Sequence, residues 1–246
     1  MGNGLQDINW SVRKAPRIAW FLASQAVLRK LDQKLARQPR ELALADTVER
    51  EATPGDVDAV LRTMDAFSQR RRWLMSMGPE KGALVTAAMH DASIRNVLEI
   101  GTYCGYSALL VARHLAPRGG HLVTLEVSRR NSAVARRVIA QAGLAEVIEV
   151  RNEVLDKAIA SFDAPFDLVL LDHWKDEYLG DLRRLESARL LRPGAVVIAD
   201  NVGFFRVPDY LDYVRQGGRY DSRYVPGSVE YHPQLPDGVE ISTFKG

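Results

Sequence analysis

The sequence has a single cysteine, Cys104, among its 246 residues. One thiol excludes an internal disulfide, and this scarcity fits a reducing compartment, so we expect a cytoplasmic protein. No histidine stands near Cys104 in the sequence, which favours a small buried residue over a thiol nucleophile. The five histidines, at positions 90, 114, 121, 173 and 232, are isolated from one another and form no zinc-binding pattern.

Long hydrophobic runs are also missing. The apolar stretch "RIAWFLASQAVL" is about eleven residues long, whereas a helix that spans a bilayer needs roughly 20. No small-residue cleavage site follows it cleanly, which argues against a signal peptide. Apolar residues recur in this region at roughly helical spacing, which predicts an amphipathic helix. They are Ile18, Phe21, Leu22, Leu28 and Leu35.

The N-terminal region is the one strongly charged part of the chain. Residues 1–40 hold eight Lys or Arg against two Asp, while the remainder is mildly acidic. We therefore expect a basic helical extension over residues 1–50, followed by a catalytic domain over residues 51–246. The extension has two interpretations, contact with a membrane surface or partner, or packing on its own domain or a second subunit. No aromatic and basic residues interleave as in an RNA-binding surface, so we expect no nucleic-acid partner.

From residue 96 onward, apolar strand patterns alternate with helical ones. We expect strands at 96–100, 119–127, 146–150, 166–172 and 195–200. We expect helices at 107–115, 128–143, 153–162 and 178–191, the second of them with Ser128 as its cap. Two further helices, at 57–73 with Asp56 as its cap and at 83–92, precede the first strand. Such alternation predicts βαβ units around a parallel sheet covered on both faces. After Arg219, two extended segments are expected to close the sheet with an antiparallel pair.

A glycine-rich turn, "EIGTYCGYSA", joins the first strand to its helix. Gly101 and Gly105 allow a sharp turn and close approach of a ligand, and the following helix N-terminus attracts a negative group. The G-x-G-x-x-G pattern is absent, which argues against a classical dinucleotide site. Glu99 and Glu126 stand at neighbouring strand ends, where Glu126 suits two ribose hydroxyls. The alternative is a tight turn that binds nothing.

Oxygen-bearing side chains follow two other strands. Asp172 comes after the fourth strand, and Asp200 and Asn201 after the fifth. Because the carboxyl ends of parallel strands share one edge, these side chains should converge there, and their hard oxygens suit Mg²⁺. Lys175 lies three residues beyond Asp172, where a partly desolvated lysine beside a cation can act as a general base. Helix capping, a turn and an ordinary surface lysine are the simpler interpretations.

Five segments together resemble the catechol O-methyltransferase family: "RRWLMSMGPEKG", "EIGTYCGYSA", "LLDHWKDEYL", "IADNV" and "SVEYH". The similarity covers roughly residues 56–243. It implies a Rossmann-like methyltransferase fold, α/β in class, whose seven-stranded, mostly parallel sheet has a reversed last strand. It also implies S-adenosylmethionine and Mg²⁺ as cofactors. The acceptor would be a catechol-like small molecule, methylated on one hydroxyl.

The resemblance also implies roles for individual residues. The cofactor site would comprise Met75, Glu99, Gly101, Tyr103, Ser107, Glu126, Val127, Asp172, His173 and Trp174. In it, Met75 would lie near the sulfonium, and His173 and Trp174 would border the adenine. The metal ligands would be Asp172, Asp200 and Asn201, and Lys175 would be the general base. The substrate would contact Trp73, Lys175, Asn201, Phe205 and Glu230.

The chain also departs from the family pattern. Val154 and Leu155 stand where the family has polar side chains toward the adenine edge, and Phe204 or Phe205 replaces a proline near the substrate. The same chemistry on a bulkier vicinal-diol phenol, such as a caffeoyl ester or a flavonoid, is therefore an alternative. A third alternative is a methyltransferase fold kept as a non-catalytic binding module.

Overall fold

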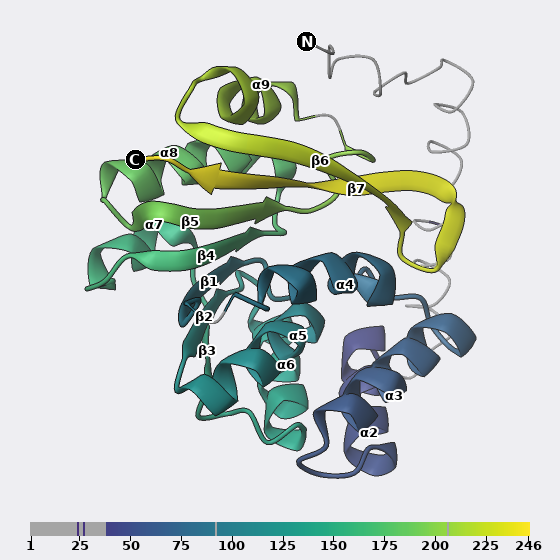
Figure 1. The fold of residues 1–246 in the computed structure, drawn as a ribbon. Helices are drawn as coiled ribbons and strands as arrows, with labels where there is room; N and C mark the ends of the chain where they lie inside the picture. The colour runs from purple at the N-terminus through teal and green to yellow at the C-terminus, as the bar shows by residue number, and fades with distance from the viewer. Residues whose placement is uncertain (1–23, 25–26, 28–37, 92, 206) are drawn as a thin grey trace.

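A computed structural model describes residues 24, 27, 38–91, 93–205 and 207–246. These residues form a seven-stranded sheet of order β3-β2-β1-β4-β5-β7-β6, in which only β7 runs against its neighbours (Figure 1). The expected sheet with a reversed last strand is thereby confirmed. The strands are β1 (Asn96–Ile100), β2 (His121–Leu125), β3 (Ile148–Arg151), β4 (Phe166–Leu171), β5 (Leu191–Ala199), β6 (Tyr220–Val229) and β7 (His232–Phe244).

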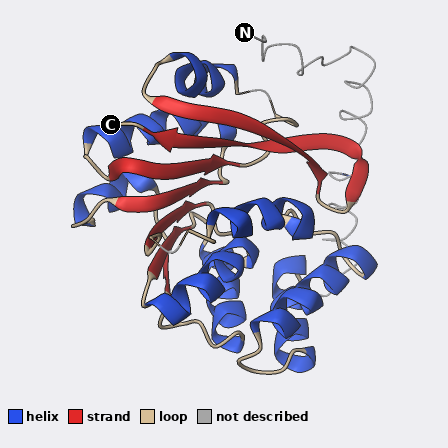
Figure 2. Cartoon of the chain, in the orientation of Figure 1, coloured by secondary structure: helices blue, strands red, loops and turns tan. Residues whose placement is uncertain are grey.

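Helices cover both faces of the sheet (Figure 2). One layer holds α4 (Gly78–Ala88), α5 (Tyr106–Leu115) and α6 (Arg129–Gln141), with α2 (Arg40–Glu51) and α3 (Val57–Arg70) outside them. The other holds α7 (Leu155–Ala158), α8 (Tyr178–Ser187) and α9 (Pro208–Gln216). Short 3₁₀ segments are η1 (Ala116–Arg118), η2 (Ile159–Ser161) and η3 (Lys175–Glu177).

The apolar run of β4 explains how the sheet is buried on both sides. Leu168 and Leu170 pack into the layer of α4, α5 and α6, whereas Val169 and Leu171 pack into the layer of α7, α8 and α9. Side chains alternate between the two faces of a strand, so a continuous apolar run serves both cores at once.

Several boundaries differ from expectation. Helix α7 is four residues long and is followed by η2, α8 ends at Ser187 instead of 191, and β5 begins at Leu191 instead of 195. The largest shift is at the start of α4. This helix begins at Gly78, five residues earlier than predicted, because Pro79 occupies its first turn, where a missing N–H costs nothing. The expected caps are present: Asp56 Oδ1 accepts from Ala59 N at 2.9 Å, and Ser128 Oγ accepts from Asn131 N at 3.3 Å. Helix α9 was not foreseen from the sequence.

Helix α2 packs on the rest of the protein. Leu44 and Val48 are fully buried, and Arg137 of α6 bonds Asp46 Oδ1 and Glu49 Oε2 at 2.6 and 2.5 Å. Residues 40–50 thus pack with the body, although the expected boundary assigns them to the extension. Of the expected amphipathic helix between Ile18 and Leu35, only residues 24 and 27 are described, and both are helical; the rest lies outside the described residues. No helix in the described part of the chain combines the length and apolar character needed to cross a bilayer.

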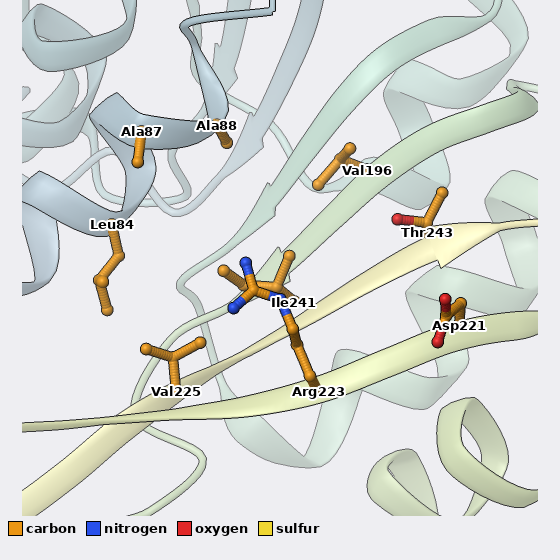
Figure 3. A pocket seen from close by; sticks show the side chains of 9 residues that line it. All are labelled: Leu84, Ala87, Ala88, Val196, Asp221, Arg223, Val225, Ile241 and Thr243. Carbon is orange, nitrogen blue, oxygen red and sulfur yellow. The ribbon is translucent and has the colours of Figure 1, made fainter.

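A groove lies between α4 and the strands β5, β7 and β6 (Figure 3). Leu84 and Ala87 line it from the helix, and Val196, Arg223 and Ile241 line it from the strands. It runs over the face of the sheet, and none of the residues expected at a functional site lines it.

Candidate active site

Three strand ends meet at the carboxyl edge of the sheet. β4 pairs with β1 on one side and with β5 on the other, and Leu171 lies opposite Ala199. The next residues, Asp172 and Asp200, continue this ladder, because their N–H groups donate to Ile100 O and Leu171 O, both at 2.9 Å. The structure therefore brings both aspartates to the edge that also carries the glycine turn.

Gly101 is required by a close approach of two strand ends. Its φ is +102°, and an added Cβ would stand 2.3 Å from the carbonyl oxygen of Asp172. Gly105, with φ of +87°, lies in the left-handed region immediately before α5. Glycine at both positions brings the turn, the start of α5 and the end of β4 together.

Two glutamates flank this turn. Glu126 accepts from Tyr103 N and Ser128 N, both at 2.8 Å, and burial raises the pKa of its carboxyl. Glu99 is almost completely buried, accepts from Thr124 Oγ1 and lies within hydrogen-bonding reach of Ser107. Burial raises the pKa of Glu99 to about 7. Its Oε1 has no hydrogen-bond partner, so one buried oxygen is left for a cationic group.

Three exposed apolar side chains follow strands at this edge, and a fourth precedes α4. Val127 follows β2, Val154 follows β3, Trp174 follows β4, and Met75 precedes α4; all four are exposed, Trp174 at 78%. The one other large apolar side chain exposed in the described part of the chain is Val27. Apolar side chains exposed at the carboxyl edge of a parallel sheet are available to pack against a ligand that binds there.

The side chains of two residues expected at the cofactor site contact other parts of the protein. His173 Nε2 lies 3.0 Å from Asp181 Oδ2 without hydrogen-bond geometry, and its ring packs 5.1 Å from that of Tyr178. The phenol of Tyr103 donates to Glu41 Oε1 of α2 at 3.1 Å. Tyr103 therefore offers the turn its main-chain N–H, while its side chain ties the turn to α2.

Lys175 lies directly above the edge. Its Nζ donates to Asp172 Oδ1 at 3.3 Å and to the phenol oxygen of Tyr178 at 2.6 Å. Desolvation raises the pKa of Asp172 to about 7, although Lys175 opposes this. An acceptor carboxylate and an amine thus share one small site.

Asp200 and Asn201 are held by residues that sequence reasoning missed. Lys81 of α4 contacts Asp200 Oδ1 at 2.9 Å and Asp237 Oδ2 at 2.9 Å. Asn201, with φ of +59°, donates from Nδ2 to Asp237 Oδ2 at 2.8 Å, which turns its amide oxygen away from Asp237. Tyr178 was also missed, although its three-residue spacing from Lys175 is a helical signal.

An apolar wall stands beside these polar groups. Phe204, Val229 and Leu235 form a small cluster against which Trp73 and Phe205 pack. Lys175 Nζ lies 5.9 Å from the centre of the Phe205 ring. Trp73 Nε1 donates to the main-chain oxygen of Glu230 at 3.4 Å. Burial raises the pKa of the Glu230 carboxyl to about 7, although Lys81 bonds its Oε1 at 2.8 Å.

The donor set fits a hard divalent cation. Among the described residues, the charged side chains of this cluster are four carboxylates and two amines. They belong to Asp172, Asp200, Glu230 and Asp237, and to Lys81 and Lys175. With the acids ionised, two negative charges remain uncompensated. No three or more His, Cys, Asp or Glu among the described residues could hold a metal by themselves. An ion here would need the Asn201 amide oxygen and water or ligand oxygens, as Mg²⁺ commonly does.

Comparison with known proteins identifies the family. Residues 53–208 match the O-methyltransferase family. Catechol O-methyltransferase B of Danio rerio is 41% identical over 225 residues, covering 89% of this chain and 84% of the relative. Catechol O-methyltransferase of Bos taurus is 33% identical, covering 93% and 85%. Transmembrane O-methyltransferase of Homo sapiens is 39% identical, covering 79% and 69%.

Solved structures agree with this assignment. The O-methyltransferase TomG of Streptomyces achromogenes, solved with S-adenosylmethionine, has a TM-score of 0.64 and 26% identity over 76% of this chain and 90% of that one. An O-methyltransferase of Bacillus cereus, solved with S-adenosylhomocysteine, shares the fold, with a TM-score of 0.64 and 23% identity over 89% and 97%. The chain belongs to the catechol O-methyltransferase family and is an S-adenosylmethionine-dependent methyltransferase.

Proposed function

We propose that this enzyme methylates one hydroxyl of a catechol-type small molecule, with Asp172, Asp200 and Asn201 as ligands of Mg²⁺ and Lys175 as general base. The observation that carries the proposal is the position of the Lys175 amine, 3.3 Å from Asp172 Oδ1 and 5.9 Å from the centre of the Phe205 ring. At this position Lys175 could accept a proton from a substrate that lies between the carboxylate of Asp172 and the ring of Phe205. Two relatives that bear the name catechol O-methyltransferase support the same substrate class.

S-adenosylmethionine lies over the glycine turn in this proposal. Gly101, Tyr103 and Ser107 line the turn, and Glu126 accepts from the ribose hydroxyls through lone pairs that its two main-chain donors leave free. The unpaired Oε1 of Glu99 suits the ammonium of the methionyl group. Met75, Val127 and Trp174 lose their water contact when the cofactor covers them.

The metal site would supply positioning and acidity. When bound, Mg²⁺ orients the two catechol oxygens and makes the attacking hydroxyl more acidic. Asp172 and Asp200 provide charge, while Asn201 is directed by its bond from Nδ2 to Asp237. The two uncompensated negative charges among the described side chains favour this occupant.

The protein residues complete the reaction geometry. Lys175 accepts the proton of the attacking hydroxyl, and Glu230 accepts a hydrogen bond from the second hydroxyl. Trp73 and Phe205 hold the ring between them. Methyl transfer from a sulfonium is an in-line displacement, so holding the acceptor oxygen on the methyl's axis contributes much of the rate.

A methylation assay on a panel of phenols, with and without Mg²⁺ and with mass spectrometry of the products, tests the proposal. Catechols should be methylated once and only with the metal, and EDTA should abolish turnover. Bulkier caffeoyl esters or flavonoids would be preferred if Phe204 and Phe205 widen the site. Lys175→Ala should greatly reduce turnover while S-adenosylmethionine still binds; Lys157→Ala, at an exposed lysine of α7, is the control.

The proposal also covers the basic extension and the compartment. A cytoplasmic enzyme whose N-terminal segment contacts a membrane surface or a second subunit fits the charge of residues 1–40. Deleting residues 1–37 leaves α2 in place. Loss of salt-sensitive binding to anionic liposomes on this deletion would support membrane contact, and a change in oligomeric state would support subunit contact.

A further inference from the structure

Lys81 is a fully buried lysine that the proposed chemistry does not use. It lies in the first turns of α4 with 0% of its surface exposed. Its Nζ contacts Asp200 Oδ1 at 2.9 Å, Glu230 Oε1 at 2.8 Å and Asp237 Oδ2 at 2.9 Å. These three acids belong to the end of β5, the β6–β7 turn and β7, so one ammonium joins three separate segments.

The match of donors to acceptors makes this contact directional. An ammonium has three N–H donors and no acceptor. Here it donates to Asp200 Oδ2 at 3.0 Å and to Asp237 Oδ2 at 2.9 Å, and Glu230 Oε1 lies 2.8 Å away as an ion-pair partner. Buried charges hold a fixed geometry when each is paired and hydrogen-bonded. The side-chain stem passes beside Gly227 of β6, where an added Cβ would lie 3.4 Å from Lys81 Cγ.

The three partners serve different sides of the site. Asp200 belongs to the metal side, and Glu230 faces the second hydroxyl of the acceptor. Asp237 faces neither, but its carboxylate also accepts from Asn201 Nδ2 at 2.8 Å and from Phe204 N at 2.9 Å. Lys81 therefore links Glu230 to Asp200 and to Asp237. Asp237 in turn bonds the side chain of Asn201 and the main chain of Phe204.

We propose that Lys81 is a positioning residue for the acceptor: it holds Glu230 at a set distance from the metal side, and so acts on catechol binding and not on cofactor binding. This inference rests on the proposed function. If Lys81 had a purely structural role, its loss would instead lower the stability of the protein and weaken the binding of catechol and cofactor together.

The first test compares Lys81→Met with the wild type by calorimetry. Catechol is titrated in the presence of Mg²⁺ and S-adenosylhomocysteine, and S-adenosylmethionine is titrated separately. The catechol Kd should rise about 10- to 100-fold, since one partner of a buried charge pair is lost. The cofactor Kd should stay within about twofold, well below a tenfold step of 1.4 kcal/mol.

Glu186→Gln is the matched control. Glu186 is another buried carboxylate, bonded by Arg219 and by the phenols of Tyr213 and Tyr220. Tyr220 begins β6, whereas Glu230 follows its end. This variant should lower the unfolding temperature without changing the catechol Kd.

A second pair of variants decides the matter even if Lys81→Met alone does not fold. Lys81→Met combined with Glu230→Gln removes one charge of each sign and is compared with Glu230→Gln alone. If Lys81 acts through Glu230, the two should bind catechol within about threefold of each other, because contacting residues are not additive. A further tenfold loss on adding Lys81→Met, or a parallel loss of cofactor binding, overturns the assignment. Failure of the wild type to bind catechol with Mg²⁺ would contradict the proposed function itself.

Discussion

The phenol oxygen of Tyr178 lies 2.6 Å from Nζ of Lys175 and donates toward the main-chain oxygens of Leu171 and Asp200, at 2.7 and 3.0 Å. A hydroxyl has one proton, and the two carbonyls can only accept it. The phenol oxygen must therefore act as an acceptor toward Lys175. Because Tyr178 is fully buried and its phenol is bonded to the main chain at the ends of β4 and β5, it is a rigid partner that orients the flexible side chain of Lys175.

Replacing Tyr178 with Phe should separate this orientation from the fold. We expect turnover to fall about tenfold, since misplacing a catalytic group costs rate without costing binding. Two buried carbonyls lose their donor as well, at roughly 1–3 kcal/mol of unfolding free energy. Steady-state kinetics and denaturant unfolding measure the two effects. Tyr213→Phe, which removes a phenol bonded to Glu186, is the control; turnover equal in both variants would refute the orienting role.

The glycine turn gives a sharper stability prediction. In Gly101→Ala the new Cβ would meet main-chain atoms of Asp172 at 2.3 and 2.6 Å, which no side-chain rotation relieves. We expect a loss of at least about 3 kcal/mol, at the upper end for a single substitution, and a loss of cofactor binding. Unfolding in denaturant and cofactor titration measure the outcome.

The substitution Gly194→Ala measures, for comparison, the stability cost of a left-handed backbone conformation alone. Gly194 has a φ of +87°, but nothing lies within 4 Å of the added Cβ. The left-handed conformation alone should cost about 1–2 kcal/mol. If both alanine variants lost the same stability, the close approach to Asp172 would not be what requires glycine at position 101.

The sheet and its edge were predictable because local patterns determine them. A continuous apolar run such as that of β4 can be buried on both faces only in a covered parallel sheet, and parallel strands place Asp172 and Asp200 at one edge. Ser128 and Asp56 act as caps through contacts three residues away, within reach of sequence reasoning.

The missed residues depend on distant contacts. Lysine is usually exposed, and the glycines and proline of "GPEKG" favour a turn, so nothing local predicts that Lys81 is buried in a helix. Its acids are 119 to 156 residues away in the sequence. The orientation of His173 also depends on a distant contact: the resemblance implies that it borders the adenine, and its Nε2 lies 3.0 Å from Asp181 Oδ2 on α8.

Two tryptophans should report the two ligands separately. Trp174 is exposed and should be covered by the adenine, whereas Trp73 packs in the wall beside Glu230. Trp174→Phe should remove most of the fluorescence change caused by S-adenosylmethionine while keeping the unfolding temperature, because an exposed ring contributes little to stability. Trp73→Phe should keep that change and lose the response to catechol with Mg²⁺. Identical responses in the two variants would contradict the assigned positions.

The buried carboxyl of Glu99 should make the ligand-free protein less stable as pH rises. Its pKa is about 7 in the folded protein against an ordinary 4.5, so between these values the folded state keeps a proton that the unfolded state releases. Stability is then fully present below pH 4.5 and falls as pH approaches 7, by up to roughly 3 kcal/mol at 1.36 kcal/mol per pKa unit.

Glu99→Gln removes this titration and leaves a similar shape, so it should be more stable than the wild type at pH 8 and close to it at pH 4.5. Glu146→Gln, at an exposed site, should leave the pH profile unchanged. The Glu99→Gln variant should also bind S-adenosylmethionine more weakly, because the unpaired Oε1 no longer offers a charge to the cofactor's ammonium. Unfolding at both pH values and cofactor titration check the two effects. A variant that gained stability at pH 8 yet bound the cofactor as tightly as the wild type would place the ammonium elsewhere.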